Sequence, residues 1–183
     1  MVRTCYLEPT MKNNVPRSKF VKPAAFLLAA LSIAITLSGC GTPPPKPVLT
    51  TLSASVSASA SSNPDGRNRP SPIVVRVYEL RSTAAFNTAD FFALYDKDRE
   101  TLAADLVARD EFTLRPGDSV VINREIKSET KHIAVIAGFR ELERSVWRSS
   151  AAVSVGSINR TTISVDGRNV NVSVTPSAHP VTK

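Results

Sequence analysis

Cys40 is the residue whose type and surroundings point most directly to chemistry, because it closes the tetrapeptide Leu37–Cys40, Leu-Ser-Gly-Cys. An apolar run, Ala24–Leu37, precedes it and follows a basic lead, as in a secretory signal. Small residues directly before a cysteine are the pattern at which bacterial enzymes attach diacylglycerol to the thiol and cut the chain. The sequence therefore predicts a lipoprotein signal peptide over residues 1–39 and a covalent lipid on Cys40.

The predicted lipid would anchor the protein to a membrane without spanning it. The apolar run is shorter than the roughly 20 residues that a membrane-spanning helix needs, whereas two or more acyl chains hold a protein stably. Gly41 stands where an Asp would signal retention at the inner membrane, which favours the inner leaflet of the outer membrane, facing the periplasm. A plain signal peptide with a coincidental cysteine and an uncleaved helix are the alternatives, and Met11 is a second candidate start.

Groups of residues at the spacing typical of catalytic or metal sites are scarce in the rest of the chain. After residue 39 the histidines are His132 and His179, which are not at metal-ligand spacing, and Cys40 is the only cysteine. Ser128–Lys131 matches Ser-x-x-Lys without the partner motifs of penicillin-interacting enzymes, and Asp96–Glu100 lacks the glycine and the distal acid of a calcium loop. We therefore predict no enzyme, no metal, no cofactor beyond the lipid and no small-molecule substrate.

The charge of the chain excludes one further class of partner. Removal of residues 1–39 lowers the formal net charge from +7 to +3, and the remaining charges are interspersed. No basic stripe of the kind that follows a phosphate backbone is left, so nucleic acid is not expected as a partner. Residues 40–48 are rich in proline and predict a stiff tether, residues 49–176 a single domain, and residues 177–183 a flexible tail.

The domain alternates between apolar and polar residues in a way that predicts strands. Leu52–Ala60 alternates strictly, although a flexible Ser/Ala linker is an open alternative there. The other strands are expected at Ile73–Leu80, Glu111–Leu114, Ser119–Ile126, His132–Phe139, Val146–Val155, Thr161–Val165 and Arg168–Val174. Eight strands with frequent turn signals indicate a mainly β fold, an eight-stranded β-sandwich.

Two local patterns refine this prediction. At about 83–108 the period changes to a helical one, and two short helices are expected, the one after Asp90 being capped by that residue. Asp166-Gly167 between two alternating runs predicts a two-residue hairpin in which both residues have positive φ. Ser61–Pro72 is dense in turn-forming residues and is expected to be a long, exposed, polar loop.

Two side chains beyond these patterns also carry expectations. Trp147 is expected to pack in the core with some cation–π contact to Arg148. Arg140 is expected to pair with Glu141 or Glu143 at the end of a strand.

Five blocks along the chain carry a resemblance to a known family. The chain resembles the TssJ family, outer-membrane lipoproteins of the type VI secretion system, in Arg69–Leu80, in Phe86 with Ala89–Tyr95, in Leu114–Gly117, in Gly138–Arg140 and in Trp147-Arg148. The resemblance runs from the predicted lipidation signal to about Val174. It implies a transthyretin-like β-sandwich of two four-stranded sheets with a helical addition, in agreement with the strand pattern.

The same resemblance implies assembly rather than catalysis. TssJ lipoproteins bind the periplasmic C-terminal region of TssM, an inner-membrane protein that pairs with TssL. The contact loop of the family maps onto Asn63, Pro64, Asp65, Gly66, Arg67, Asn68 and Arg69. The expected function is docking of a TssM-like protein, and indirectly a TssL-like protein, to the outer membrane. A lipoprotein that binds an envelope ligand such as peptidoglycan or sugar is the alternative.

Overall fold

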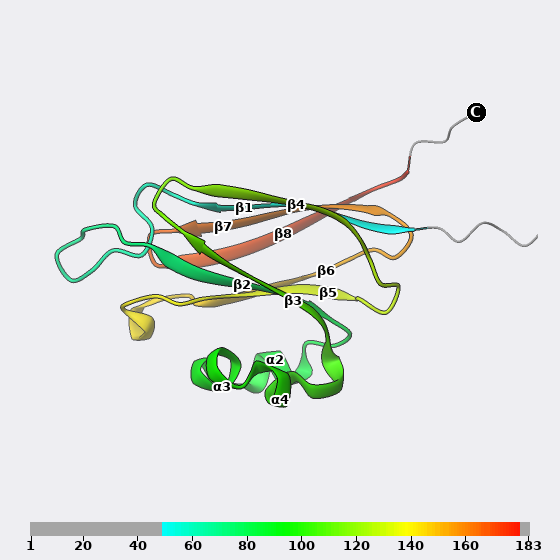
Figure 1. The fold of residues 1–183 in the computed structure, drawn as a ribbon, viewed down its shortest axis with the longest axis horizontal. Helices are drawn as coiled ribbons and strands as arrows, with labels where there is room; N and C mark the ends of the chain where they lie inside the picture. Colours follow the sequence, from blue (N-terminus) through cyan, green and yellow to red (C-terminus); the bar gives the residue numbers. More distant parts are fainter. Residues whose placement is uncertain (1–48, 180–183) are drawn as a thin grey trace, which may run out of the picture. The chain divides into compact units, whose positions relative to one another are not determined.

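Two four-stranded sheets pack face to face in the computed structural model, which describes residues 49–179 (Figure 1). Their strand orders are β4-β1-β7-β8 and β3-β2-β5-β6. The strands are β1 (Thr50–Ala58), β2 (Ile73–Leu80), β3 (Leu106–Leu114), β4 (Ser119–Ile126), β5 (His132–Ala137), β6 (Arg148–Ala152), β7 (Ile158–Asp166) and β8 (Asn169–Ser177). The prediction of a mainly β, eight-stranded sandwich with a helical insertion is confirmed.

Strand β1 lies inside its sheet and pairs with a neighbour on each side. It runs antiparallel to β4 and parallel to β7. Its apolar residues Leu52, Ala54 and Val56 are buried, whereas the serines between them lie on the outer face of the sheet. Period-two burial of this kind is what a strand with one covered face requires. The alternative of a flexible Ser/Ala linker is therefore excluded.

Residues 49–179 form two apolar cores, one on each face of the β3-β2-β5-β6 sheet. The larger core lies between the sheets, and the smaller one lies between this sheet and the helices. Strand β5 is apolar without alternation because both of its faces are buried. Ile133 and Val135 belong to the larger core between the sheets, and Ala134 and Ile136 to the smaller core under the helices. A strand that is covered on both faces has no solvent side to occupy with polar residues.

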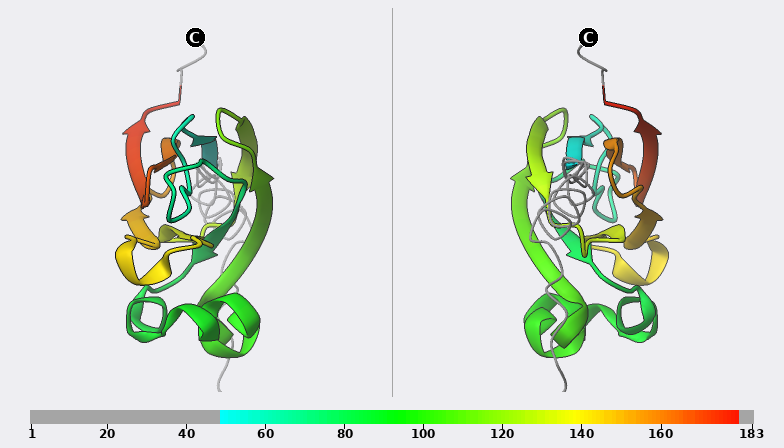
Figure 2. Two further views of the ribbon diagram at one scale, coloured as in Figure 1. Left: turned by 90° about the vertical axis from the view of Figure 1, so that its left-hand side faces the viewer. Right: turned by 90° about the vertical axis from the view of Figure 1, so that its right-hand side faces the viewer.

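The helical layer covers only the outer face of the β3-β2-β5-β6 sheet (Figures 1 and 2). It consists of α2 (Ala84–Thr88), α3 (Phe91–Asp96), α4 (Asp98–Leu102) and the 3-10 helix η1 (Ala103–Asp105), whereas the 3-10 helix η2 (Leu142–Arg144) lies in the β5–β6 segment. The predicted cap is confirmed, since the Asp90 carboxylate accepts a 2.9 Å hydrogen bond from the Ala93 backbone N–H. The expectation of two helices is wrong, because the described insertion contains three short α-helices and the 3-10 turn.

The end of the insertion also differs from the prediction. Leu106 and Val107 recur at helical spacing, but both belong to β3. Ala103 has a φ of 42°, which stops the helix, and Leu106 then pairs with Leu80 beyond an irregularity in the β2–β3 ladder. Pairing with β2, a contact distant in sequence, overrides the local helical period.

Arginines from the sheet hold the helical layer in place. Arg76 donates to carbonyls at the C-terminal end of α3, Arg148 to carbonyls at the end of α2, and Arg81 to a carbonyl of η1. The last carbonyls of a helix lack partners within the helix, and positive charge is favourable there. The helices α2 and α3 and the 3-10 helix η1, each too short to be stable alone, are thus fixed to the sheet by charge-assisted hydrogen bonds.

A partly buried ion network joins the two sheets along their β3 and β4 edges. The Arg124 guanidinium, on β4, lies 2.7 Å from the Glu79 carboxylate on β2 and 2.6 Å from the Asp110 carboxylate on β3. The Glu79 side chain is 4% exposed, and its second oxygen accepts from the Thr130 hydroxyl at 3.1 Å. A buried carboxylate without a partner is strongly destabilising. Arg124 therefore links the two sheets and also compensates the buried negative charge of Glu79.

Several sequence predictions lie outside the described residues. The signal peptide 1–39, Cys40 with its lipid, the tether 40–48 and most of the tail precede or follow the residues that the structure describes. Within residues 49–179, none of the helices has the length and apolar character that a membrane crossing requires.

Candidate functional site

The loops at one end of the sandwich are connected by hydrogen bonds, and we call this the loop end. It comprises the β1–β2 loop (residues 59–72), the β5–β6 segment (residues 138–147) and the β7–β8 turn at Gly167 and Arg168. The Asn63 N–H donates to the Gly167 carbonyl at 2.8 Å, and the Arg140 N–H donates to the Asn63 side-chain oxygen at 2.9 Å. Three segments distant in sequence therefore form one surface (Figure 2, left).

Leu49, the first described residue, lies directly before β1 at the opposite end of the sandwich, which we call the Leu49 end. The Leu49 carbonyl lies 2.8 Å from the His179 ring nitrogen Nε2, beyond the end of β8. Strand β1 begins there and ends at Ala58, next to the loop end. Nine residues of strand at about 3.3 Å each separate the two ends by roughly 30 Å.

Asp65 and Arg69 close the tip of the β1–β2 loop. One Asp65 carboxylate oxygen accepts from the backbone N–H groups of Arg67 and Arg69 at 2.9 and 3.0 Å. The other oxygen lies 2.8 and 2.7 Å from Nε and Nη2 of Arg69. The hydrogen bond from the Arg69 side chain is the largest cause that lowers the pKa of Asp65 to about 2. The tip is thus internally ordered at any ordinary pH.

The predicted contact residues divide into two groups in the structure. Asn63 and Pro64 are buried, and Asn63 has a φ of 50°. The Asn63 amide donates to the Pro72 carbonyl at 2.8 Å and accepts from Arg140, so this side chain holds the loop in place. The prediction of a wholly exposed loop is wrong, because Ser62, Asn63, Pro64 and Ser71 are buried. Gly66, Arg67, Asn68 and Arg69 remain exposed, with Asp65 half-buried behind them.

The β5–β6 segment uses different ion pairs from the predicted ones. The Glu141 carboxylate lies 3.0 Å from Arg168 of the β7–β8 turn and 4.0 Å from Arg144. Among the described residues, the Arg140 guanidinium makes no ion pair or side-chain hydrogen bond. The expected pairing of Arg140 with Glu141 or Glu143 is therefore wrong. Glu141 pairs instead with Arg168, which lies in the β7–β8 turn and is distant in sequence.

The β7–β8 hairpin forms one residue later than predicted. Asp166 still pairs with Asn169, so the two central residues are Gly167 and Arg168, and of these Gly167 has positive φ, 53°. A glycine at the first central position is typical of the type II′ hairpin turn. The shift matters to the site, because it places Arg168 where it reaches Glu141.

The remaining candidates have structural roles. Lys131 donates to the Ser128 carbonyl within the turn between β4 and β5. Asp98, from the acidic run, is buried and lies 2.6 Å from the Arg109 guanidinium, which explains its presence without a metal. The predicted Trp147 contact is confirmed, with Arg148 4.8 Å from the ring centroid. Residues 49–179 contain no group of three or more His, Cys, Asp or Glu side chains that could hold a metal ion.

Sequence reasoning missed one feature of the surface. Phe92 belongs to the predicted helical insertion, and the structure shows that its side chain is 65% exposed on α3, beside the β5–β6 segment. The sequence signal that could have found it is the pair Phe91-Phe92, because two adjacent positions of a short helix cannot both face the same core.

Two sheets, a helical layer on one of them and a set of connected loops at one end define a transthyretin-like β-sandwich. A sequence profile of the family described as type VI secretion lipoprotein (VasD, EvfM, TssJ) matches residues 50–168. The chain therefore belongs to the TssJ family of type VI secretion lipoproteins, as its sequence resemblance predicts. This family is a structural lipoprotein component and not an enzyme.

Solved structures agree with this assignment. The chain is 32% identical to the T6SS lipoprotein TssJ1 from Pseudomonas aeruginosa, with a TM-score of 0.67, over 70% of this chain and 98% of that one. It is 26% identical to Serratia marcescens Lip, a membrane-bound component of the type VI secretion system, with a TM-score of 0.60, over 73% of this chain and 99% of that one.

A third similar chain comes from a solved type VI membrane complex. Its identity is 28% and its TM-score 0.59, over 70% of this chain and 99% of that one. A structure described as the TssM C-terminal domain from EAEC contains a chain of the same fold at 24% identity, with a TM-score of 0.54, over 69% of this chain and 98% of that one. No protein of the curated set matches this sequence.

Proposed function

We propose that this lipoprotein docks the periplasmic C-terminal region of a TssM-like inner-membrane protein to the outer membrane, through the exposed part of its β1–β2 loop. The chain belongs to the TssJ family, and a chain 28% identical to it lies in a type VI membrane complex. Through its TssM-like partner, the protein would also be linked to a TssL-like protein.

The observation that carries this proposal is the position and order of the loop. The tip formed by residues 65–69 lies about 30 Å from the Leu49 end, at which the predicted tether of residues 40–48 joins the domain. A lipid on Cys40 in the inner leaflet of the outer membrane would hold the domain in the periplasm. The tip would then be the part of the domain that a partner from the inner membrane can meet.

The chemistry of the tip fits a protein partner. Arg67 and Asn68 are exposed and offer guanidinium and amide donors, and the Arg69 side chain is 70% exposed although Asp65 holds its position. A loop whose backbone is already fixed loses little conformational entropy when it binds, which favours affinity. Loops on a rigid sheet scaffold are the usual carriers of such contacts.

Co-purification tests the proposal directly. The lipoprotein is extracted from its own membrane in detergent and passed over the immobilised periplasmic region of the TssM-like protein. Retention that is lost when Gly66–Arg69 is replaced by a Gly/Ser sequence of the same length supports docking through the loop. Absence of retention, with both proteins shown to be folded, contradicts the proposal and favours an envelope ligand such as peptidoglycan or sugar.

A further inference from the structure

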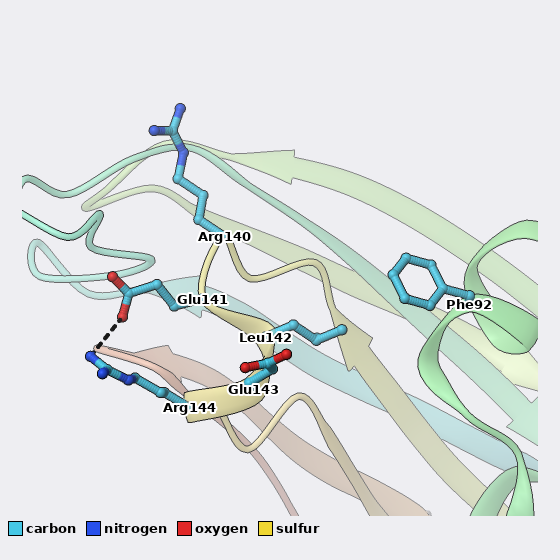
Figure 3. A pocket seen from close by; sticks show the side chains of 6 residues that line it. All are labelled: Phe92, Arg140, Glu141, Leu142, Glu143 and Arg144. Atoms are coloured by element: carbon cyan, nitrogen blue, oxygen red, sulfur yellow. Dashed lines mark ion pairs between the residues drawn. The ribbon is translucent and has the colours of Figure 1, made fainter.

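An open cavity lies beside the proposed docking loop, between α3 and the β5–β6 segment. Its volume is about 490 Å³, and it is lined by Phe92, Arg140, Glu141, Leu142, Glu143 and Arg144. Phe92 and Leu142 point toward each other from opposite sides of it (Figure 3). The cavity thus has two apolar walls of large side chains within a rim of charged groups.

Phe92 is exposed, yet its ring packs against the aromatic cluster of α3. Its ring packs edge-on against Phe91 at a centroid distance of 5.5 Å, and Phe91 in turn contacts Tyr95 and Trp147 at 5.1 and 5.3 Å. The Arg76 guanidinium lies 4.4 Å from the Tyr95 ring centroid and also bonds the end of α3. Exposed aromatic side chains of this kind are enriched at protein interfaces.

The cavity is continuous with the loop end. Glu141, on its rim, lies 3.6 Å from the position that a Cβ of Gly66 would occupy, and Arg140 donates its N–H to Asn63. A partner that covers Gly66–Arg69 would therefore lie next to Phe92 and Leu142. Burial of both against the partner would extend the contact along the side of the domain.

The free charges on the rim favour an acidic occupant. Glu141 is paired with Arg168 at 3.0 Å and more loosely with Arg144 at 4.0 Å, and the Arg144 side chain is 81% exposed. The Arg140 guanidinium has no partner among the described residues. Glu143 is the opposing charge, exposed on the same rim. With Arg168 included, this group carries three cations and two anions, an excess that a carboxylate on the partner would offset.

We propose that the cavity binds a bulky apolar side chain of the same partner protein, on a segment that also carries carboxylates for Arg140 and Arg144. This inference rests on the proposed docking function and extends its contact from the loop to α3. Phe92 is then the apolar anchor, and the two arginines select an acidic segment over a basic one.

The test measures the affinity of the detergent-extracted lipoprotein for the periplasmic region of the TssM-like protein. Phe92→Ala is expected to weaken binding about tenfold or more, and Val121→Ala, which alters a side chain that is also 65% exposed but lies on β4, is the matched control. Circular dichroism and thermal unfolding should be the same for both variants. Weakening by Phe92→Ala alone supports the cavity as a contact, whereas equal affinity of the two variants overturns it.

Charge variants test the chemistry of the occupant. Arg140→Glu is expected to weaken binding, and Glu143→Gln to strengthen it slightly, with both effects decreasing at high salt. If Glu143→Gln weakens binding and Arg140→Glu has no effect, the inference that the bound segment is acidic is overturned. If the unaltered lipoprotein does not bind the partner region, the docking function and this inference both fall; if it binds and only the loop replacement weakens it, only this inference falls.

Discussion

The Arg140 backbone N–H donates a 2.9 Å hydrogen bond to the Asn63 side chain, which joins the β5–β6 segment to the base of the β1–β2 loop. The same amide donates to the Pro72 carbonyl at 2.8 Å, so one buried side chain connects both ends of the loop with a second segment. The exposed tip is therefore positioned by a residue that itself makes no contact with solvent.

Replacement of Asn63 should affect both stability and binding. Asn63→Ala removes the side-chain partner of the Arg140 N–H and of the Pro72 carbonyl, and it places an alanine at a φ of 50°, where asparagine is tolerated better. We expect the free energy of unfolding to fall by about 2 kcal/mol, measured by urea denaturation, with weaker partner binding. Asn68→Gly is the control, because Asn68 is exposed at a φ of 59° and glycine is favourable there. Equal stability of the two variants would contradict this role of Asn63.

The Asp65–Arg69 pair should order the tip over a wide pH range. A carboxylate whose pKa is lowered by folding contributes stability that is present above its ordinary pKa of 3.8 and is lost as the pH falls through about 2. Partner binding should therefore show no step between pH 5 and 8 that depends on Asp65. Asp65→Asn should weaken binding several-fold at pH 7 and lower the melting temperature slightly, because the Arg69 guanidinium loses its charged partner. Asp118→Asn, in another turn, is the control, and equal binding by both variants would exclude preorganisation by Asp65.

Arg124 should be required mainly because Glu79 is buried. Arg124→Met leaves the Glu79 carboxylate without its guanidinium partner, and we expect a loss of about 3 kcal/mol in the free energy of unfolding. The double variant Arg124→Met with Glu79→Gln should recover part of that loss, since the buried Glu79 charge is removed and only the more exposed Asp110 keeps its charge. Chemical denaturation of the four proteins of this cycle gives the coupling energy. Strict additivity would show that the network does not act as a unit.

Cys40→Ser should separate folding from anchoring. The domain of residues 49–179 contains both cores and no cysteine, so its circular dichroism and melting temperature should not change. Without acyl chains the protein should leave the membrane fraction, and type VI secretion should stop. Continued secretion by a soluble, unlipidated protein would refute anchoring as part of the mechanism.

The sequence predicted the sandwich well where the burial of a residue depends on its own strand. The alternation in β1 and the β-branched run in β2 are local consequences of which face is covered. The prediction failed at Leu106, where pairing with Leu80 outweighs a helical period, and at the β7–β8 turn, where the register decides which residues are central.

The candidate site was predicted less completely for the same physical reason. The family resemblance indicated the loop, but the burial of Asn63 depends on Arg140 and Gly167, which are distant in sequence. The exposure of Phe92 likewise depends on how α3 is oriented on the sheet by Phe91 and Asp90. Contacts between distant segments leave no trace in a local pattern, so the structure was needed to divide the loop into a buried base and an exposed tip.

The most direct measurement is calorimetric titration of the lipoprotein in detergent with the periplasmic region of the TssM-like protein, for the unaltered chain and for the chain with Gly66–Arg69 replaced by Gly/Ser. We expect saturable binding by the unaltered chain and a large loss of affinity in the loop variant at unchanged melting temperature. Saturable binding of equal affinity by both proteins would contradict docking through this loop, and no binding by either would contradict the docking function itself.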